Sequence, residues 1–147
     1  MSVKNLSILR RAFLIWTLII AAEFLHGVLR VLLLEPLVGD FRARQIAVFT
    51  GMLIILTISR LFVGWLRAAN DFQLFLAGLI WVVLTIAFEI SLGRLLGFSW
   101  ERILSDYDIS NGGLMLLGLL FLMFAPLIAA KLREKSATNF TNFTNKN

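Results

Sequence analysis

The sequence predicts an all-α fold, an integral membrane bundle of four transmembrane helices, from three observations. Hydrophobic residues make up 59% of the 147 residues, and charged residues only 16%. The mean hydropathy is +0.87. The apolar residues occur in long runs rather than in amphipathic alternation, which is typical of membrane-spanning helices. Four such runs take up most of the length, so we expect a single domain over residues 1–135.

The four apolar runs set the bounds of the expected spans. These lie at about residues 12–34, 46–66, 72–92 and 113–130. The first run follows Lys4, Arg10 and Arg11, as the apolar part of a signal peptide follows basic residues. Because the run is long and further spans follow, we expect a retained anchor. Gly51 and Gly118 lie inside spans, where small residues let helices approach one another closely.

The connections between the spans differ in length. The residue before a proline is disfavoured in a helix, so we expect the first helix to end at Glu35, before Pro36. Residues 35–45 then form a short charged loop. The tight connection 67–71 predicts that the second and third spans are antiparallel neighbours. The polar tail, residues 136–147, is expected to be disordered.

The longest connection, residues 93–112, has a pattern of its own. Ser99 is expected to cap a short amphipathic helix, Trp100–Ser105, that lies at the membrane–water interface before the fourth span. The stretch from Asp106 resembles the start of a calcium-binding loop, but Leu117 stands where such a loop carries an acid. We therefore expect a turn that caps the fourth helix.

The positions of lysine and arginine predict the orientation of the bundle. The amino-terminal segment has three, the second connection one and the tail four, against two in the first connection and two in the third. Eight against four places both termini in the cytoplasm, because basic residues accumulate on that side of a membrane. We expect a multi-pass protein of the inner (plasma) membrane of a bacterium. The same asymmetry accounts for the net charge of +5, so we expect no nucleic-acid partner.

A stripe of ionisable residues runs along the first span. Glu23, His26 and Arg30 follow one another at i, i+3 and i+7, so they share one face of a helix. Ionisable groups at membrane depth normally face a protein interior or a wet cavity. Glu89 of the third span lies at nearly the height of Arg30, which predicts an ion pair between them. These four residues form the predicted buried polar stripe.

A second set of charged residues lies on the outer side in the predicted orientation. Its members carry both signs, which favours a paired network over a field of one charge. The predicted outer-face polar network consists of Asp40, Arg42, Arg44, Arg94, Glu101, Arg102, Asp106 and Asp108.

Three interpretations of the stripe stay open. Glu23 and His26 have the spacing of ferritin-like carboxylate metal sites, but such sites use two of these pairs and the chain has one, so both are weak metal-ligand candidates. Glu23, His26 and Glu89 would also serve as steps of a proton path. The sequence favours a third interpretation, in which the polar residues satisfy one another and fix the register of the helices.

Composition excludes several kinds of chemistry. The chain has no cysteine, which excludes thiolate metal sites and cysteine nucleophiles, and its single histidine cannot by itself supply a haem with two histidine ligands. The sequence holds neither a nucleophile with a base beside it nor a glycine-rich phosphate loop. We therefore expect no catalytic residues and no cofactor, although the sequence alone does not decide whether the protein is an enzyme.

The expected function follows from the small size and the helix faces. We expect a structural or accessory membrane subunit that acts through helix–helix contacts, with the lipid bilayer, other membrane subunits or copies of itself as partners. One alternative is a small proton- or cation-linked transporter or channel component that uses Glu23, His26 and Glu89. A second alternative is a lipid- or metal-dependent enzyme of the outer interface.

Overall fold

The structure is a computed structural model that describes residues 3–144, and every regular element in that range is helical. In that range there are six α-helices, one π-helical segment (η1) and one 3₁₀ turn (η2). In chain order the elements are α1 (Val3–Leu29), η1 (Arg30–Leu34), α2 (Glu35–Val38), α3 (Asp40–Leu66), α4 (Asp71–Leu95), α5 (Trp100–Ser105), η2 (Ile109–Asn111) and α6 (Met115–Thr144).

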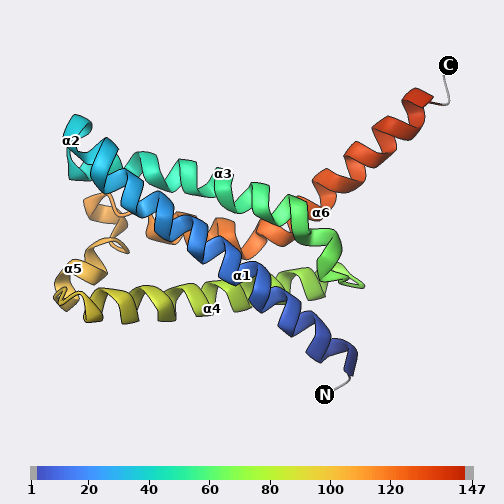
Figure 1. The fold of residues 1–147 in the computed structure, drawn as a ribbon, viewed down its shortest axis with the longest axis horizontal. Coiled ribbons are helices and arrows are strands. Elements are labelled where there is room, and N and C mark those ends of the chain that lie inside the picture. Colours follow the sequence, from blue (N-terminus) through green and yellow to red (C-terminus); the bar gives the residue numbers. More distant parts are fainter. Residues whose placement is uncertain (1–2, 145–147) are drawn as a thin grey trace.

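Four of the helices are long and apolar enough to cross a membrane, which confirms the predicted all-α class. The first combines α1, η1 and α2 over Leu6–Val38, the next two are α3 and α4, and the last is α6 over Met115–Asn139. Their mean hydropathy lies between 2.0 and 2.2. They alternate in direction, so the two ends of the chain lie at one end of the bundle, and α2 and α5 lie at the other (Figure 1).

The first helix does not end before Pro36, so this sequence-based prediction is wrong. Helical structure continues through Pro36 to Val38 and ends at Gly39, which has a φ of +81°. The π-helical turn precedes the proline, and the Glu35 N–H donates to the Arg30 carbonyl five residues back. We attribute the continuation to this wider turn, which eases the loss of a backbone donor at the proline. Residues 40–45 are consequently the first turns of α3 rather than a loop.

The order of helices around the bundle also differs from the prediction. Helix α3 packs against α1 and α6, and α4 packs against the same two helices. Helices α3 and α4 therefore stand diagonally opposed and are not the neighbours that the tight connection suggested.

Asn70 caps the start of α4 by accepting a hydrogen bond from the Gln73 N–H at 3.0 Å.

The buried core lies mainly in the half of the bundle that carries the chain ends. Trp16 donates from Nε1 to Thr85 Oγ1 at 3.0 Å, and Trp81 donates from Nε1 to the Ala12 carbonyl at 2.8 Å. Both indole donors are thus satisfied inside the core, as buried tryptophans require. Further buried core residues include Ile19, Leu66, Leu74, Ala77, Leu122, Ala125 and Ala129.

A glycine sets the distance between α4 and α6. A Cβ atom built on Gly78 would lie 1.9 Å from the Met123 carbonyl oxygen, so only glycine allows the two backbones to come this close. Gly118, which the sequence suggested for packing, has no atom within 4 Å of a built Cβ and faces open space.

Helix α6 runs further than the sequence suggests. It extends to Thr144, so residues 136–144 are helical where the sequence predicts a disordered tail. Ser136 accepts a hydrogen bond from Arg60 Nη2 at 2.7 Å, which ties the start of this extension to α3. The rest of the extension projects away from the bundle (Figure 1). The last three residues of the predicted tail lie outside the described residues.

The short helix before the fourth span is present as predicted. Helix α5 begins after Ser99, whose side chain accepts from the Arg102 N–H at 3.2 Å. Ile103 is buried against the bundle, whereas Trp100 and Leu104 are exposed. Helix α5 thus presents an apolar surface outward as well as inward.

Candidate functional site

The predicted polar stripe lines a cavity in the half of the bundle that carries α5. The cavity has a volume of about 720 Å³ and is bounded by α1, η1, α3, α4, α6 and the connection through α5. Glu23, His26, Arg30 and Glu89 all line it. Most of the remaining wall is apolar, and includes Phe24, Val48, Phe88, Leu92, Met115 and Leu119.

Glu23 and His26 form a polar group on the cavity wall. His26 Nδ1 lies 3.5 Å from Glu23 Oε2, and His26 Nε2 lies 2.8 Å from the Thr50 hydroxyl of α3. Gly51 makes room for the carboxylate, because a Cβ there would lie 2.8 Å from Glu23 Oε2. The other carboxylate oxygen, Oε1, is buried and accepts no hydrogen bond from the described residues.

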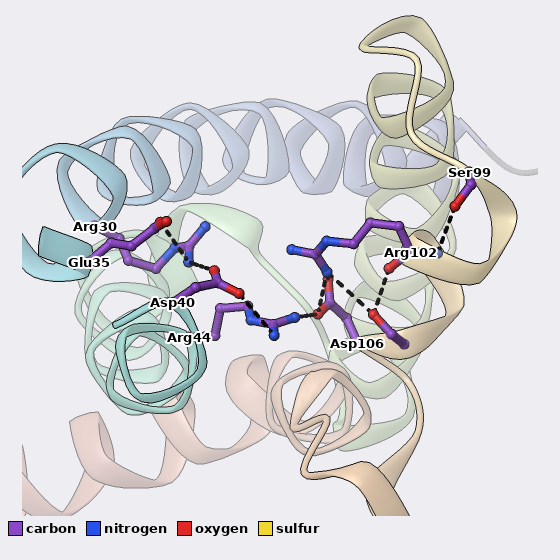
Figure 2. Close-up of polar contacts among 8 residues, drawn as sticks. Arg30, Glu35, Asp40, Arg44, Ser99, Arg102 and Asp106 are labelled. Carbon is purple, nitrogen blue, oxygen red and sulfur yellow. Dashed lines mark hydrogen bonds and ion pairs between the residues drawn. The ribbon is translucent and has the colours of Figure 1, made fainter. Parts of the chain in front are cut away.

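Arg30 does not pair with Glu89, so the predicted ion pair between the first and third spans is wrong. Arg30 Nη1 lies instead 3.4 Å from Asp40 Oδ1 and 3.9 Å from Glu35 Oε2 (Figure 2). The reason is the helical continuation to Val38. The chain reverses at Gly39, and this reversal returns Asp40 to the side of Arg30.

Arg30 begins a chain of ion pairs across the rim of the cavity. Asp40 Oδ2 lies 3.1 Å from Arg44 Nη2, and Arg44 Nη1 lies 2.6 Å from Asp106 Oδ1. Asp106 Oδ1 also lies 3.2 Å from Arg102 Nη1 of α5. Figure 2 shows these alternating charges linking the start of α3 to the α5 segment. Of this chain, Arg30, Arg44, Asp106 and Arg102 line the cavity.

The remaining members of the predicted outer-face network lie apart from this chain of ion pairs. Arg94 stacks on Trp100 at 5.1 Å and donates to the Phe98 carbonyl at 2.9 Å. Asp108 accepts from the Ser110 N–H at 3.0 Å and so caps the turn η2. Arg42 and Glu101 are exposed, and neither forms an ion pair with another residue in the described range.

Tyr107 lines the cavity, although a tyrosine in a connection beside a span is typical of the membrane–water interface. Its hydroxyl is buried and lies beside the Glu89 carboxylate, without a hydrogen bond of normal geometry within residues 3–144. Burial, together with the negative charges of Glu89 and Asp106, raises the pKa of Tyr107 to about 12. The only signal in the sequence is its place between two acids, Asp106 and Asp108, which fits an exposed turn equally well.

The charges on the cavity wall are unevenly balanced. At the rim, Arg30, Arg44 and Arg102 contact the three acids Glu35, Asp40 and Asp106. Further in, Glu23 and Glu89 form no ion pair with an arginine or lysine of the described residues. The inner part of the cavity therefore carries two carboxylates with a single histidine beside one of them.

Several polar atoms on the wall have hydrogen-bonding capacity left over. Within the described part of the chain, four buried side-chain atoms lack a hydrogen-bond partner. Three of them belong to residues that line this cavity, namely Glu23 Oε1, Arg44 Nε and the Tyr107 hydroxyl. They offer a carboxylate acceptor, an N–H donor and a hydroxyl that does both. Such a wall is able to hold a polar group of a bound molecule.

The cavity closes toward the middle of the bundle. Beyond Glu23 and Glu89, the floor of the cavity is lined by Ile19, Ile55, Thr85 and Leu122, and the Thr85 hydroxyl accepts the hydrogen bond from Trp16. Beyond this level lies the tightly packed core around Trp81. The cavity is therefore closed at the middle of the bundle and lies only in the half that carries α5.

The structure does not support a metal site at Glu23 and His26. No group of three or more histidine, cysteine, aspartate and glutamate side chains suited to a metal ion occurs among the residues that were described. A ferritin-like site needs further carboxylates around such a pair.

Comparisons with protein-family models, with curated proteins and with solved structures found no match for this chain. The fold and the site define it as a helical bundle with four helices long and apolar enough to cross a membrane, and with a polar-ended cavity between them.

Proposed function

We propose that the protein spans a membrane and binds an amphiphilic molecule, drawn from the bilayer, in the cavity near α5. The cavity is the single observation that carries this proposal. Its volume of about 720 Å³ and its apolar wall with a few polar groups are typical of sites for small ligands. A molecule with an apolar body and a polar group would match both parts of the wall.

The position of the opening favours access from the bilayer. Helix α1 contacts α4 through Trp16 and Trp81, and further along the chain Glu23 and His26 lie against Gly51 and Thr50 of α3. The cavity is lined on one side by Val31 and Leu32 and on the other side by Leu96 and Phe98. All four side chains are also exposed. Exposed apolar side chains of this kind suit a lipid environment, so a ligand would pass between them without leaving the hydrocarbon.

The proposed placement has both termini in the cytoplasm and α5 on the outer side of a bacterial inner membrane. The shared position of the chain ends and the lysine and arginine count support it. The ion pairs from Arg30 to Arg102 would then lie near the outer headgroups, where charged side chains are least costly.

Cavity-filling variants test the proposal. Gly118 and Gly27 line the cavity and have no atom within 4 Å of a built Cβ, so Gly118→Leu and Gly27→Leu add volume without a clash at the backbone. In nanodiscs doped with a phospholipid that carries a photoreactive acyl chain, we expect wild-type protein to be cross-linked at cavity residues. Both variants should lose that cross-linking.

Ala87→Leu provides the matched control, because Ala87 is exposed on α4 and does not line the cavity. It should be cross-linked like the wild type. Equal cross-linking of cavity residues in wild type and Gly118→Leu would contradict the proposal.

The accessory-subunit role stays a prediction that depends on a partner. The transporter alternative needs a path through the whole bundle, and the packed core around Trp16 and Trp81 gives that alternative no support in this conformation.

A further inference from the structure

We infer that the cavity selects amphiphiles whose polar part is a cation, such as a lipophilic ammonium or phosphonium group. This inference rests on the proposed function, because it names the chemical class of the ligand for the same cavity. It is drawn from how charges are distributed between the rim and the inner end.

The rim offers little free charge to a ligand. Arg44 lies between Asp40 and Asp106 at 3.1 and 2.6 Å, and Arg102 shares Asp106. Arg30 is held by Asp40 at 3.4 Å. An anionic headgroup would meet the carboxylates that already hold these guanidinium groups, with Arg44 Nε the only buried guanidinium donor left over in the described range, which makes the rim a poor site for a phosphate or carboxylate.

The inner end has the opposite character. Glu23 and Glu89 both line the cavity, and no lysine or arginine in the described range pairs with either. His26 lies 3.5 Å from Glu23, and it supplies one positive charge at most. With both carboxylates ionised, the inner end is therefore negative whether or not His26 is protonated.

A cation on the ligand would complement this end in two ways. It would neutralise carboxylates that are partly removed from water, and an unpaired charge in such a place is costly. Phe24 and Phe88, the chain neighbours of Glu23 and Glu89, also line the cavity, and aromatic rings attract cations through their faces. The oxygen Glu23 Oε1, buried and without a hydrogen bond, is available to contact it.

The test uses two ions of the same shape and opposite charge, tetraphenylphosphonium and tetraphenylborate. Binding of each labelled ion to the full chain in neutral-lipid nanodiscs is measured by equilibrium dialysis, and uptake by empty nanodiscs is subtracted. We expect saturable binding of the cation only. Glu23→Gln and Glu89→Gln should each weaken it by about tenfold or more, as expected when one charged partner of a buried pair is removed.

Two controls keep the result interpretable. Glu101→Gln removes an exposed carboxylate outside the cavity and should leave cation binding unchanged. Glu89→Asp keeps the charge and should retain most of the binding, which separates loss of charge from damage to the fold.

The outcomes separate this inference from the proposed function. Saturable binding of tetraphenylborate that Gly118→Leu abolishes would overturn the cation preference and leave the amphiphile-binding cavity standing. Full cation affinity in both glutamine variants would also overturn the inference. If neither ion binds, the inference fails, and the cross-linking experiment decides separately whether the cavity takes up a lipid.

Discussion

Tyr107 offers a direct probe of the cavity at the scale of a single residue. It is the only tyrosine in the chain, so tyrosinate absorbance reports on it alone. Because burial and the neighbouring acids Glu89 and Asp106 raise its pKa to about 12, we expect the folded protein to titrate near that value, and the unfolded chain near 10.0. Glu89→Gln should move the folded titration toward the ordinary value. A folded-state titration near 10 would contradict the buried position of the hydroxyl.

The same shift has a consequence for stability, and its sign follows from the raised folded-state pKa. The folded protein favours the neutral phenol, so this contribution to stability is fully present below pH 10 and is lost as the pH rises toward 12. Tyr107→Phe should remove this alkaline loss in unfolding experiments.

Residue spacing in the sequence predicted some of the site correctly and some of it wrongly. The i, i+3, i+7 pattern of Glu23, His26 and Arg30 led to one helix face, and all three residues line the cavity. The partner of Arg30 was wrong because it depends on a reversal at Gly39 that no periodicity reveals. Tyr107 was missed as a cavity residue because its burial comes from the fold of the α5 connection over α4.

Helix packing at Gly78 gives a prediction at the scale of secondary-structure elements. Gly78→Ala places a methyl group against the Met123 carbonyl of α6, where a built Cβ lies at 1.9 Å. We expect a loss of about 1–3 kcal/mol in the free energy of unfolding, the usual cost of overpacking a core. Gly118→Ala is the control, since it meets open space and replaces glycine inside a helix, so stability should be unchanged or higher. Equal stability of the two variants in denaturant titrations in detergent would show that α4 and α6 are not in close contact.

The predictions for the helices were also correct in part and wrong in part. Four long apolar runs predicted four membrane-length helices, because length and hydropathy are local properties of the chain. The order of the helices around the bundle is not local. A tight connection places two helix ends near each other, but the closeness of α4 to α6 at Gly78 is a long-range fit of surfaces. Likewise, the proline rule failed at Pro36 because a π-helical turn preceded it.

Orientation is a property of the whole molecule, and the absence of cysteine makes it easy to test. Glu101→Cys and Glu134→Cys each place one thiol at an exposed glutamate, one in α5 and the other in the carboxy-terminal part of α6. In intact cells we expect a membrane-impermeant maleimide to label the first variant and to reach the second only after lysis. The reverse pattern would invert the proposed topology, and labelling of both in intact cells would contradict a bundle that spans the membrane.

At the scale of the whole bundle, the two halves differ in how they are packed. The half near the termini is a packed core with satisfied tryptophans, and the half near α5 encloses a cavity that carries acids. Buried carboxylates without a lysine or arginine partner lower stability, and under the proposed function Glu23 and Glu89 serve in binding rather than in holding the fold.

Native mass spectrometry of the protein released from nanodiscs tests the central claim most directly. We expect the wild type and Ala87→Leu to retain a bound amphiphile, and Gly118→Leu, with a leucine in the cavity, to be released without one. Equal retention by all three proteins, or release of the wild type with nothing bound, would contradict an amphiphile-binding cavity.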